Sequence, residues 1–148
     1  MRAVTIGGIL TLCCAASMAA QRAPNTAGVR PIASVKQLHD VMITPASDAV
    51  FAAAGETPAN AKAWEAARNQ ALVLAEAGNL LMLGSRARDN AAWMTMSRAL
   101  VDAAATAAAA AEKKDAKALE GAGDSITVAC ETCHRPYRDR GRQMGAPR

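Results

Sequence analysis

The sequence predicts an all-α protein, an antiparallel bundle of four helices, and three observations support this class. Of the 148 residues, 51% are hydrophobic but only 3% are aromatic, so most of the apolar content is alanine and aliphatic side chains, which favour helices. Valine and isoleucine are sparse, and no stretch alternates apolar and polar residues over the length of a strand. Capping and turn signals divide the chain into four helical segments with short connections, which implies antiparallel neighbours.

The first twenty residues are predicted to be a secretory signal peptide, and they are set aside from the fold. Arg2 precedes an apolar run at 4–14, and small residues follow, with cleavage expected after residue 19 or 20. A membrane anchor is the rival interpretation, but the run is short and is diluted by glycine and threonine. Acylation of Cys13 or Cys14 is a further alternative, although leucine precedes this pair where a small residue is wanted.

The predicted domain spans residues 34–140 and follows an extended arm at 21–33. Its first helix is expected over residues 35–54, because Ser34 and Gln37 match a capping box. Gly55 would form the C-terminal cap. Pro45 lies inside this span and should kink the helix or divide it into two.

The second helix is expected to begin at the stretch GETPAN. Thr57 would be the cap and Pro58 the first helical residue, where the missing N–H of proline costs nothing. The helix should continue to about Leu83, and Gly84 should stop it.

Two more helices complete the predicted bundle. The third is expected from about Asn90, capped by Asp89, and runs into the alanine tract at 103–111. Alanine is the strongest helix former, and its small side chain lets a neighbour pack close. Asp115 would cap the fourth helix, and a basic tail at 141–148 would follow the domain.

The fourth helix carries the stretch Cys130-Glu131-Thr132-Cys133-His134. After signal removal Cys130 and Cys133 are the only cysteines, and a disulfide so short would stabilise almost nothing. C-x-x-C-H is the attachment sequence for a c-type haem. Thiols three positions apart share a helix face and would form thioethers with the two vinyl groups of one porphyrin. His134 would then be the proximal ligand of the iron, and one covalently bound haem c is the predicted cofactor.

Two alternatives use the same residues. A zinc ion would need four ligands, and the mature chain offers only Cys130, Cys133, His134 and His39. The adjacent pair at 133–134 rarely ligates one tetrahedral ion together. A thioredoxin-like dithiol needs a strand that leads into the helix, and no strand is visible in the sequence.

The position of the attachment sequence near the C-terminus indicates a class of cytochrome. Ordinary small cytochromes c carry it near the N-terminus, whereas this chain resembles the class II cytochromes c, the group of cytochrome c-prime and its low-spin relatives. The resemblance rests on CETCHRPYR at 130–138, on VKQLHDVMITPASD at 35–48, and on NLLM with RARDNAAWM between them. It covers residues 34–138.

The resemblance implies roles for two residues that follow the motif. Arg138 would lie near His134 or a haem propionate, and Tyr137 would pack along the same face. A solvated arginine and a half-buried aromatic near the chain end are the plainer interpretations. Pro136 is unexpected in a helix that continues past the motif.

The resemblance also places a residue of the first helix at the sixth coordination position of the iron. An apolar residue there leaves the iron open to small gases, and a methionine closes it. His39 stands where that methionine is expected, and Met42 shares its helix face one turn later. Either side chain could bind iron. The remaining alternative is a surface histidine and a core methionine.

These observations predict a periplasmic monohaem cytochrome that carries one electron on a six-coordinate haem. The alternative is a five-coordinate haem protein that binds NO or CO, and a haemless zinc or dithiol module is a third possibility. Export by a signal peptide agrees with covalent haem attachment, which takes place outside the cytoplasm. No nucleophile–base set or placed carboxylate pair indicates an enzyme.

The expected partners are redox proteins. The net charge of +4 is a modest excess that does not argue for nucleic acid. No membrane span is expected after processing. Many relatives in the resembled class dimerise, so a homodimer is one expectation for this chain.

Overall fold

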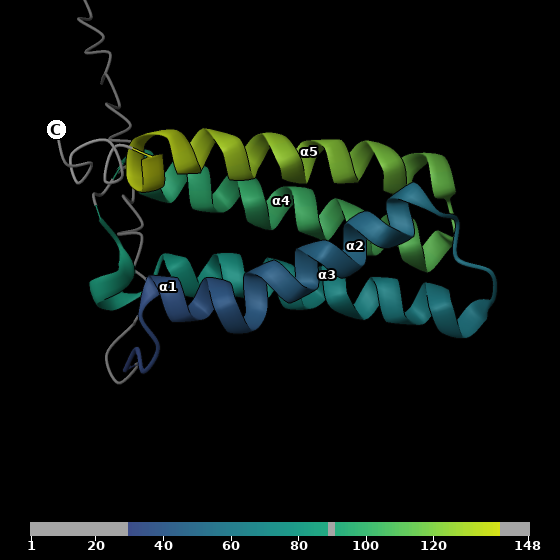
Figure 1. Ribbon diagram of the computed structural model, residues 1–148, viewed down its shortest axis with the longest axis horizontal. Coiled ribbons are helices and arrows are strands. Elements are labelled where there is room, and N and C mark those ends of the chain that lie inside the picture. The colour runs from purple at the N-terminus through teal and green to yellow at the C-terminus, as the bar shows by residue number, and fades with distance from the viewer. Residues whose placement is uncertain (1–29, 89–90, 140–148) are drawn as a thin grey trace, which may run out of the picture.

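A computed structural model describes residues 30–88 and 91–139, and this part of the chain is mostly helical and contains no strand. The predicted all-α class is confirmed. Four long helices run along the long axis of the molecule (Figure 1). They are α2 (Thr44–Gly55), α3 (Ala61–Leu81), α4 (Ala92–Lys113) and α5 (Ala116–His134). The predicted signal peptide, the arm up to residue 29 and the tail at 141–148 lie outside the described residues.

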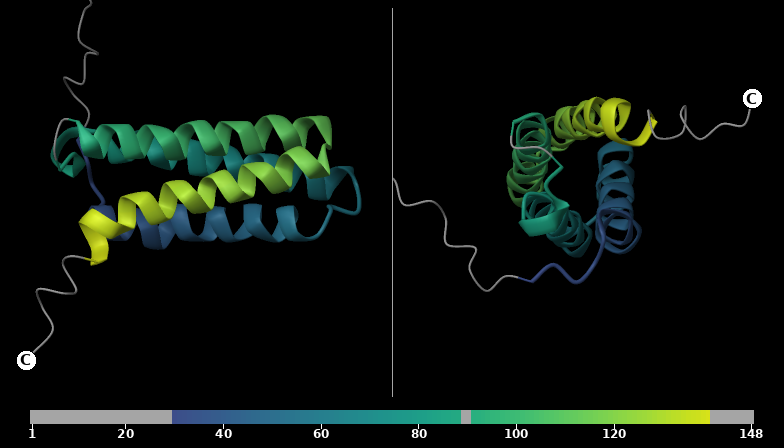
Figure 2. Two further views of the ribbon diagram at one scale, coloured as in Figure 1. Left: turned by 90° about the horizontal axis from the view of Figure 1, so that it is seen from above. Right: turned by 90° about the vertical axis from the view of Figure 1, so that its left-hand side faces the viewer.

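Each long helix packs against two of the others. The helix α3 contacts α2 and α4, and α5 contacts α4 and α2. Seen end-on, the helices surround a common interior (Figure 2, right). Within the described ranges, no helix combines the length and the apolar character that crossing a membrane requires.

The segment predicted as the first helix consists of three pieces. The short α1 (Val35–Leu38) is followed by a π-helical turn (His39–Ile43) and then by α2. The predicted capping box at Ser34 is confirmed, because Ser34 Oγ accepts from the Gln37 N–H and the Gln37 side chain accepts from the Ser34 N–H. Pro45 was expected to kink the helix or divide it into two. The helix is divided, and the irregular turn lies just before the proline.

The physical reason for the break is the backbone chemistry of proline. Pro45 has no N–H to donate, and its ring would clash with the carbonyl four residues back. The chain widens there, and the Thr44 N–H bonds to the His39 carbonyl five residues back. The helix α2 then ends at Gly55 with Glu56 as its cap, one residue beyond the predicted end.

Both predicted ends of the second helix were wrong. The helix α3 begins at Ala61, because the Asn60 side chain accepts a hydrogen bond from the Ala63 N–H, and this later cap prevails over Thr57 and Pro58. The helix ends at Leu81, two residues before the predicted end. Gly84 adopts a left-handed conformation with φ of 56°, within a 3-10 turn (Gly84–Arg86) that follows the helix.

Most of the alanine tract at 103–111 lies on the buried face of α4. This helix begins at Ala92, without a side-chain cap, and the predicted cap Asp89 lies outside the described residues. The predicted cap of the last helix is confirmed, since Asp115 Oδ1 accepts from the Ala118 N–H. The helix α5 ends at His134, and a second π-helical turn (Arg135–Asp139) contains Pro136.

Small side chains dominate the core. Most of the buried apolar residues are alanine, and Trp64 and Trp93 are the buried aromatic residues of the described chain. Trp93 Nε1 donates to the Leu81 carbonyl at 2.8 Å, which joins the start of α4 to the end of α3. A core with so few bulky side chains leaves space where the helices diverge, and the site lies in such a space.

Candidate functional site

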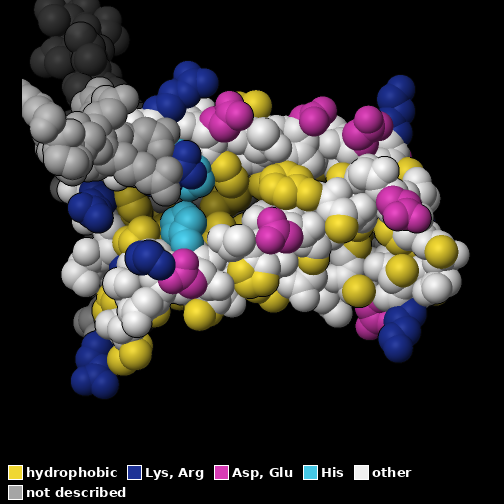
Figure 3. Space-filling model, viewed as in Figure 1, with side chains coloured by type: hydrophobic (Ala, Val, Ile, Leu, Met, Phe, Trp, Pro, Cys, Tyr) yellow, Lys and Arg dark blue, Asp and Glu magenta, His cyan; other side chains and the backbone are white. Residues whose placement is uncertain are grey.

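A cavity opens between the first helical segment and α5. It encloses about 90 Å³, and together with its mouth the space is about 500 Å³. The histidines lie on one face of the molecule, next to a hollow lined by hydrophobic side chains (Figure 3). The lining residues come from α5 (Ala129, Cys130, Cys133, His134), from the first helical segment (His39, Ile43, Thr44, Ser47), and from α3 and α4 (Leu81, Met96, Ser97, Leu100).

His39 and His134 face each other in this cavity, although 95 positions separate them in the sequence. Their ring centroids lie 5.9 Å apart, with the planes inclined by 42°. A bond from a histidine nitrogen to a metal is about 2.0 Å, and the centre of an imidazole ring lies about 1.1 Å from each ring atom. Two imidazoles on opposite sides of one metal ion therefore have centroids about 6.2 Å apart. The observed separation lies within a few tenths of an ångström of that value.

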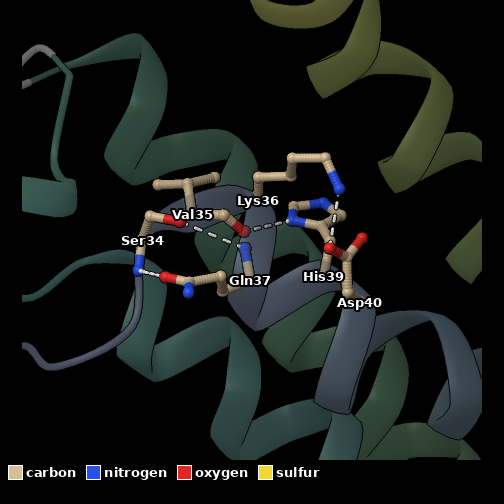
Figure 4. A network of polar contacts seen from close by, with 6 residues as sticks. All are labelled: Ser34, Val35, Lys36, Gln37, His39 and Asp40. Carbon is tan, nitrogen blue, oxygen red and sulfur yellow. Dashed lines mark hydrogen bonds and ion pairs between the residues drawn. The ribbon is translucent and has the colours of Figure 1, made fainter.

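The hydrogen bonding of His39 leaves one ring nitrogen available. Its Nδ1 lies 3.0 Å from the Val35 carbonyl oxygen, as the dashed line in Figure 4 marks. A carbonyl oxygen only accepts hydrogen bonds, so this contact requires the proton on Nδ1 and leaves the lone pair of the neutral ring on Nε2. Histidines that bind metals commonly donate their second N–H to a backbone carbonyl in this way.

The two cysteines are half-buried free thiols that line the cavity together with His134. Burial raises the pKa of the Cys130 thiol, and the charge of Glu131 adds to the effect. Burial also raises the pKa of Cys133, with Cys130 as the second cause. Reactive dithiols have a lowered pKa, so this environment does not favour the dithiol alternative.

The zinc alternative has no assembled ligand set. Among residues 30–88 and 91–139, no three or more histidine, cysteine, aspartate or glutamate side chains are arranged to hold a metal ion. The cavity brings two thiols and an imidazole together on one helix, as the attachment sequence requires, and a second imidazole opposite them.

The other predicted site residues lie outside the cavity lining. Met42 is partly buried and packs against the hydrophobic core. Tyr137 packs edge-on against Trp93, with ring centroids 4.8 Å apart and an interplanar angle of 81°. Arg138 is exposed on the π-helical turn that follows α5.

Sequence reasoning missed the wall that α3 and α4 contribute to the cavity. Ser97 lies there and is 1% exposed, and its hydroxyl oxygen has no hydrogen-bond partner in the described part of the chain. Buried hydroxyls are nearly always hydrogen-bonded, so a bound group with an acceptor oxygen, or a water, would satisfy it. The available signal was a serine at helical spacing between Trp93 and Leu100 in an otherwise apolar stripe.

Comparison with known proteins found no matching family model, no significant match among curated proteins and none among solved structures.

Proposed function

We propose that this protein is a class II c-type cytochrome, an antiparallel four-helix bundle with one haem c attached to the last helix, and that it carries single electrons in the periplasm. Thioethers to Cys130 and Cys133 would hold the haem, and His134 would be the proximal ligand. When bound, the haem would supply the one-electron chemistry between ferric and ferrous iron. The chain supplies attachment, axial ligands and a largely apolar surrounding.

The observation that carries the proposal is the pair of imidazoles 5.9 Å apart, beside two free thiols spaced for thioether formation. The separation suits two axial ligands of one metal ion. The unpartnered hydroxyl of Ser97 provides a polar contact for a bound group inside an otherwise largely apolar cavity. The donor set of the described residues, two thiols and two imidazoles, thus suits the group that the attachment sequence implies.

The same observations favour His39 over Met42 as the distal ligand. His39 lines the cavity with Nε2 available, whereas Met42 packs against the core. Iron with two strong protein ligands is six-coordinate, which suits electron transfer better than gas binding. The five-coordinate gas-binding protein remains the second candidate, because the half-buried His39 lies on an irregular segment from which it could detach.

Covalent attachment is tested by extracting the denatured protein with acidified organic solvent. The wild-type protein, matured in a periplasm that ligates haem, should keep its haem in the protein fraction. Cys130→Ala should keep it through one thioether, and the double variant Cys130→Ala/Cys133→Ala should release all of it. Haem that leaves the wild-type protein would contradict the proposal.

A further inference from the structure

Arg86 is a buried arginine in the connection between α3 and α4, outside the cavity. Only 7% of its surface is exposed. Its Nε donates to the Ala33 carbonyl at 2.9 Å, and its Nη1 donates to the Leu80 carbonyl at 3.2 Å. The Leu80 carbonyl belongs to the last turn of α3, where a positive charge is favourable. The side chain therefore ties the chain segment before α1 to the end of α3.

A second contact holds the same two segments together. Gly84 has a φ of 56°, and a Cβ built there would lie 2.9 Å from Pro31 Cγ. Glycine is favoured on both counts, because the left-handed conformation strains most other residues and a Cβ would press against the Pro31 ring. Residues 31–33 are thus docked on the turn that contains Arg86.

The docked segment leads directly to the distal histidine. Ala33 precedes Ser34, whose capping box starts α1, and the Val35 carbonyl then accepts the hydrogen bond of His39 Nδ1 (Figure 4). The helix α1 has only four residues, far fewer than an isolated helix needs to be stable. Its geometry must therefore come from its attachments. The π-helical turn that continues α1 contacts α3, and Leu38 is buried in the core. The Arg86–Ala33 hydrogen bond ties the segment before α1 to the end of α3.

We infer that Arg86 is a positioning residue for His39, acting through Ala33 and the first turn of α1. The inference rests on the proposed function, in which His39 binds the haem iron opposite His134. Without the Arg86 contact, a larger fraction of molecules should have His39 detached at any moment. Carbon monoxide binds only those molecules, so its apparent affinity rises in proportion to their fraction.

The test uses the full haem-loaded protein with Arg86→Met, Arg86→Lys and Arg88→Met. The last variant is the matched control, because Arg88 is exposed and follows the same turn. Arg86→Met removes charge-assisted hydrogen bonds and should raise the apparent affinity of the reduced protein for carbon monoxide about tenfold or more. Hydrogen exchange of the peptide that covers residues 34–39 should also become faster. Arg86→Lys keeps the charge and one contact and should fall between, while Arg88→Met should match the wild type.

The two readouts distinguish failure of the inference from failure of the proposed function. Arg86→Met with unchanged carbon monoxide affinity overturns the inference, whether or not exchange is faster, and leaves His39 ligation standing. If Arg86→Met does not fold, Arg86→Lys decides by the same criterion with a smaller expected shift. A wild-type protein without covalent haem overturns the proposed function. It also overturns the role of Arg86 in positioning His39 at the iron.

Discussion

The imidazole of His39 lines the cavity, and its Nδ1 is hydrogen-bonded to the main chain. The bond from Nδ1 to the Val35 carbonyl fixes the tautomer and the direction of Nε2. Met42 lies three residues further along a π-helical turn, where residues three apart no longer align as they do in an α-helix. The irregular turn thus separates two side chains that a regular helix would place on one face.

The distal ligand is tested by His39→Ala and Met42→Ala in the haem-loaded protein. His39→Ala should open the sixth position and give high-spin iron that binds carbon monoxide readily, unless Met42 moves in. In that event the reduction potential should rise, because a thioether stabilises reduced iron more than an imidazole does. Met42→Ala should leave the spectrum unchanged and lower stability by about 1–2 kcal/mol, less than a fully buried methionine would, because Met42 is only partly buried.

Optical spectra and carbon monoxide titrations of the two variants provide the measurement. In the reverse pattern, Met42→Ala would open the sixth coordination position of the iron and His39→Ala would leave the spectrum unchanged. That result would make Met42 the distal ligand. The electron-carrier proposal would survive that result, but the account of His39 would not.

The raised pKa values of the thiols predict how the haem-free protein responds to pH. Both thiols are raised above the ordinary value of 9.0, mainly by burial. Below that value both the folded and the unfolded chains hold the thiol protons, so the thiols do not make stability depend on pH. As the pH rises through 9.0, the unfolded chain loses its thiol protons before the folded chain does. The free energy of unfolding therefore falls until the folded thiols ionise as well.

Denaturant titrations of the haem-free protein on both sides of pH 9 measure this fall. The control is Cys130→Ser/Cys133→Ser, which shares every other titrating group and should lose less stability over the same range. Thioethers do not titrate, so the haem-loaded protein should behave like this control. An equal loss of stability in the haem-free wild type and the serine variant would contradict the predicted thiol environment.

At the scale of elements, both histidines of the described chain stand at a junction between an α-helix and a π-helical turn. His39 begins the turn before Pro45, and His134 ends α5 just before the turn that contains Pro136. π-helical turns occur frequently at functional sites. In both places a proline lies in or just after the irregular backbone. The π-helical turn itself carries His39, whereas His134 is placed at the cavity by the last turn of α5.

The packing of α3 on α4 forms the wall behind the cavity and predicts a contrast between two glycines. A Cβ on Gly78 would lie 2.7 Å from Val101 Cγ2 and 3.5 Å from the Ser97 carbonyl, whereas a Cβ on Gly121 would meet nothing within 4 Å. Valine is stiff about χ1 and cannot easily yield. Gly78→Ala should therefore cost about 1–3 kcal/mol of stability, while Gly121→Ala should gain up to about 1 kcal/mol from helix propensity.

Thermal or chemical unfolding of the two alanine variants measures the contrast. Equal gains at both positions would mean that α3 and α4 do not approach each other at Gly78 as described. Since Ser97 lies beside this contact, Gly78→Ala should also perturb the haem spectrum, and Gly121→Ala should not.

The sequence predicted those parts of the fold that are encoded by local contacts. Ser34 and Asp115 cap helices as expected, because each cap needs only a side chain and an N–H three residues away. The start of α3 was mispredicted because two capping signals lie within four residues, and Asn60 prevails over Thr57. The irregular turn before Pro45 replaces a regular helix. The proline predicts a break, but its sequence pattern alone does not distinguish a kink from a π-helical turn.

At the scale of the whole molecule, the candidate site depends on tertiary contacts. The C-x-x-C-H stretch at 130–134 is a local pattern, so the sequence alone predicts haem attachment there. Its partner His39 was suggested only by resemblance, and the packing of α2 against α5 brings the two segments together. Ser97 and Arg86 were missed, because the cavity wall and the Arg86–Ala33 bond exist only after the helices have assembled.

The central claim, a haem held between His134 and His39, makes the wild-type protein a six-coordinate electron carrier. The optical spectrum of the reduced protein, recorded with and without carbon monoxide, tests this claim most directly. We expect a low-spin six-coordinate spectrum, and carbon monoxide should bind weakly or slowly because it must displace His39 from the iron. A high-spin five-coordinate spectrum that carbon monoxide shifts at once would contradict it and favour the gas-binding protein, and a spectrum without haem bands would contradict both.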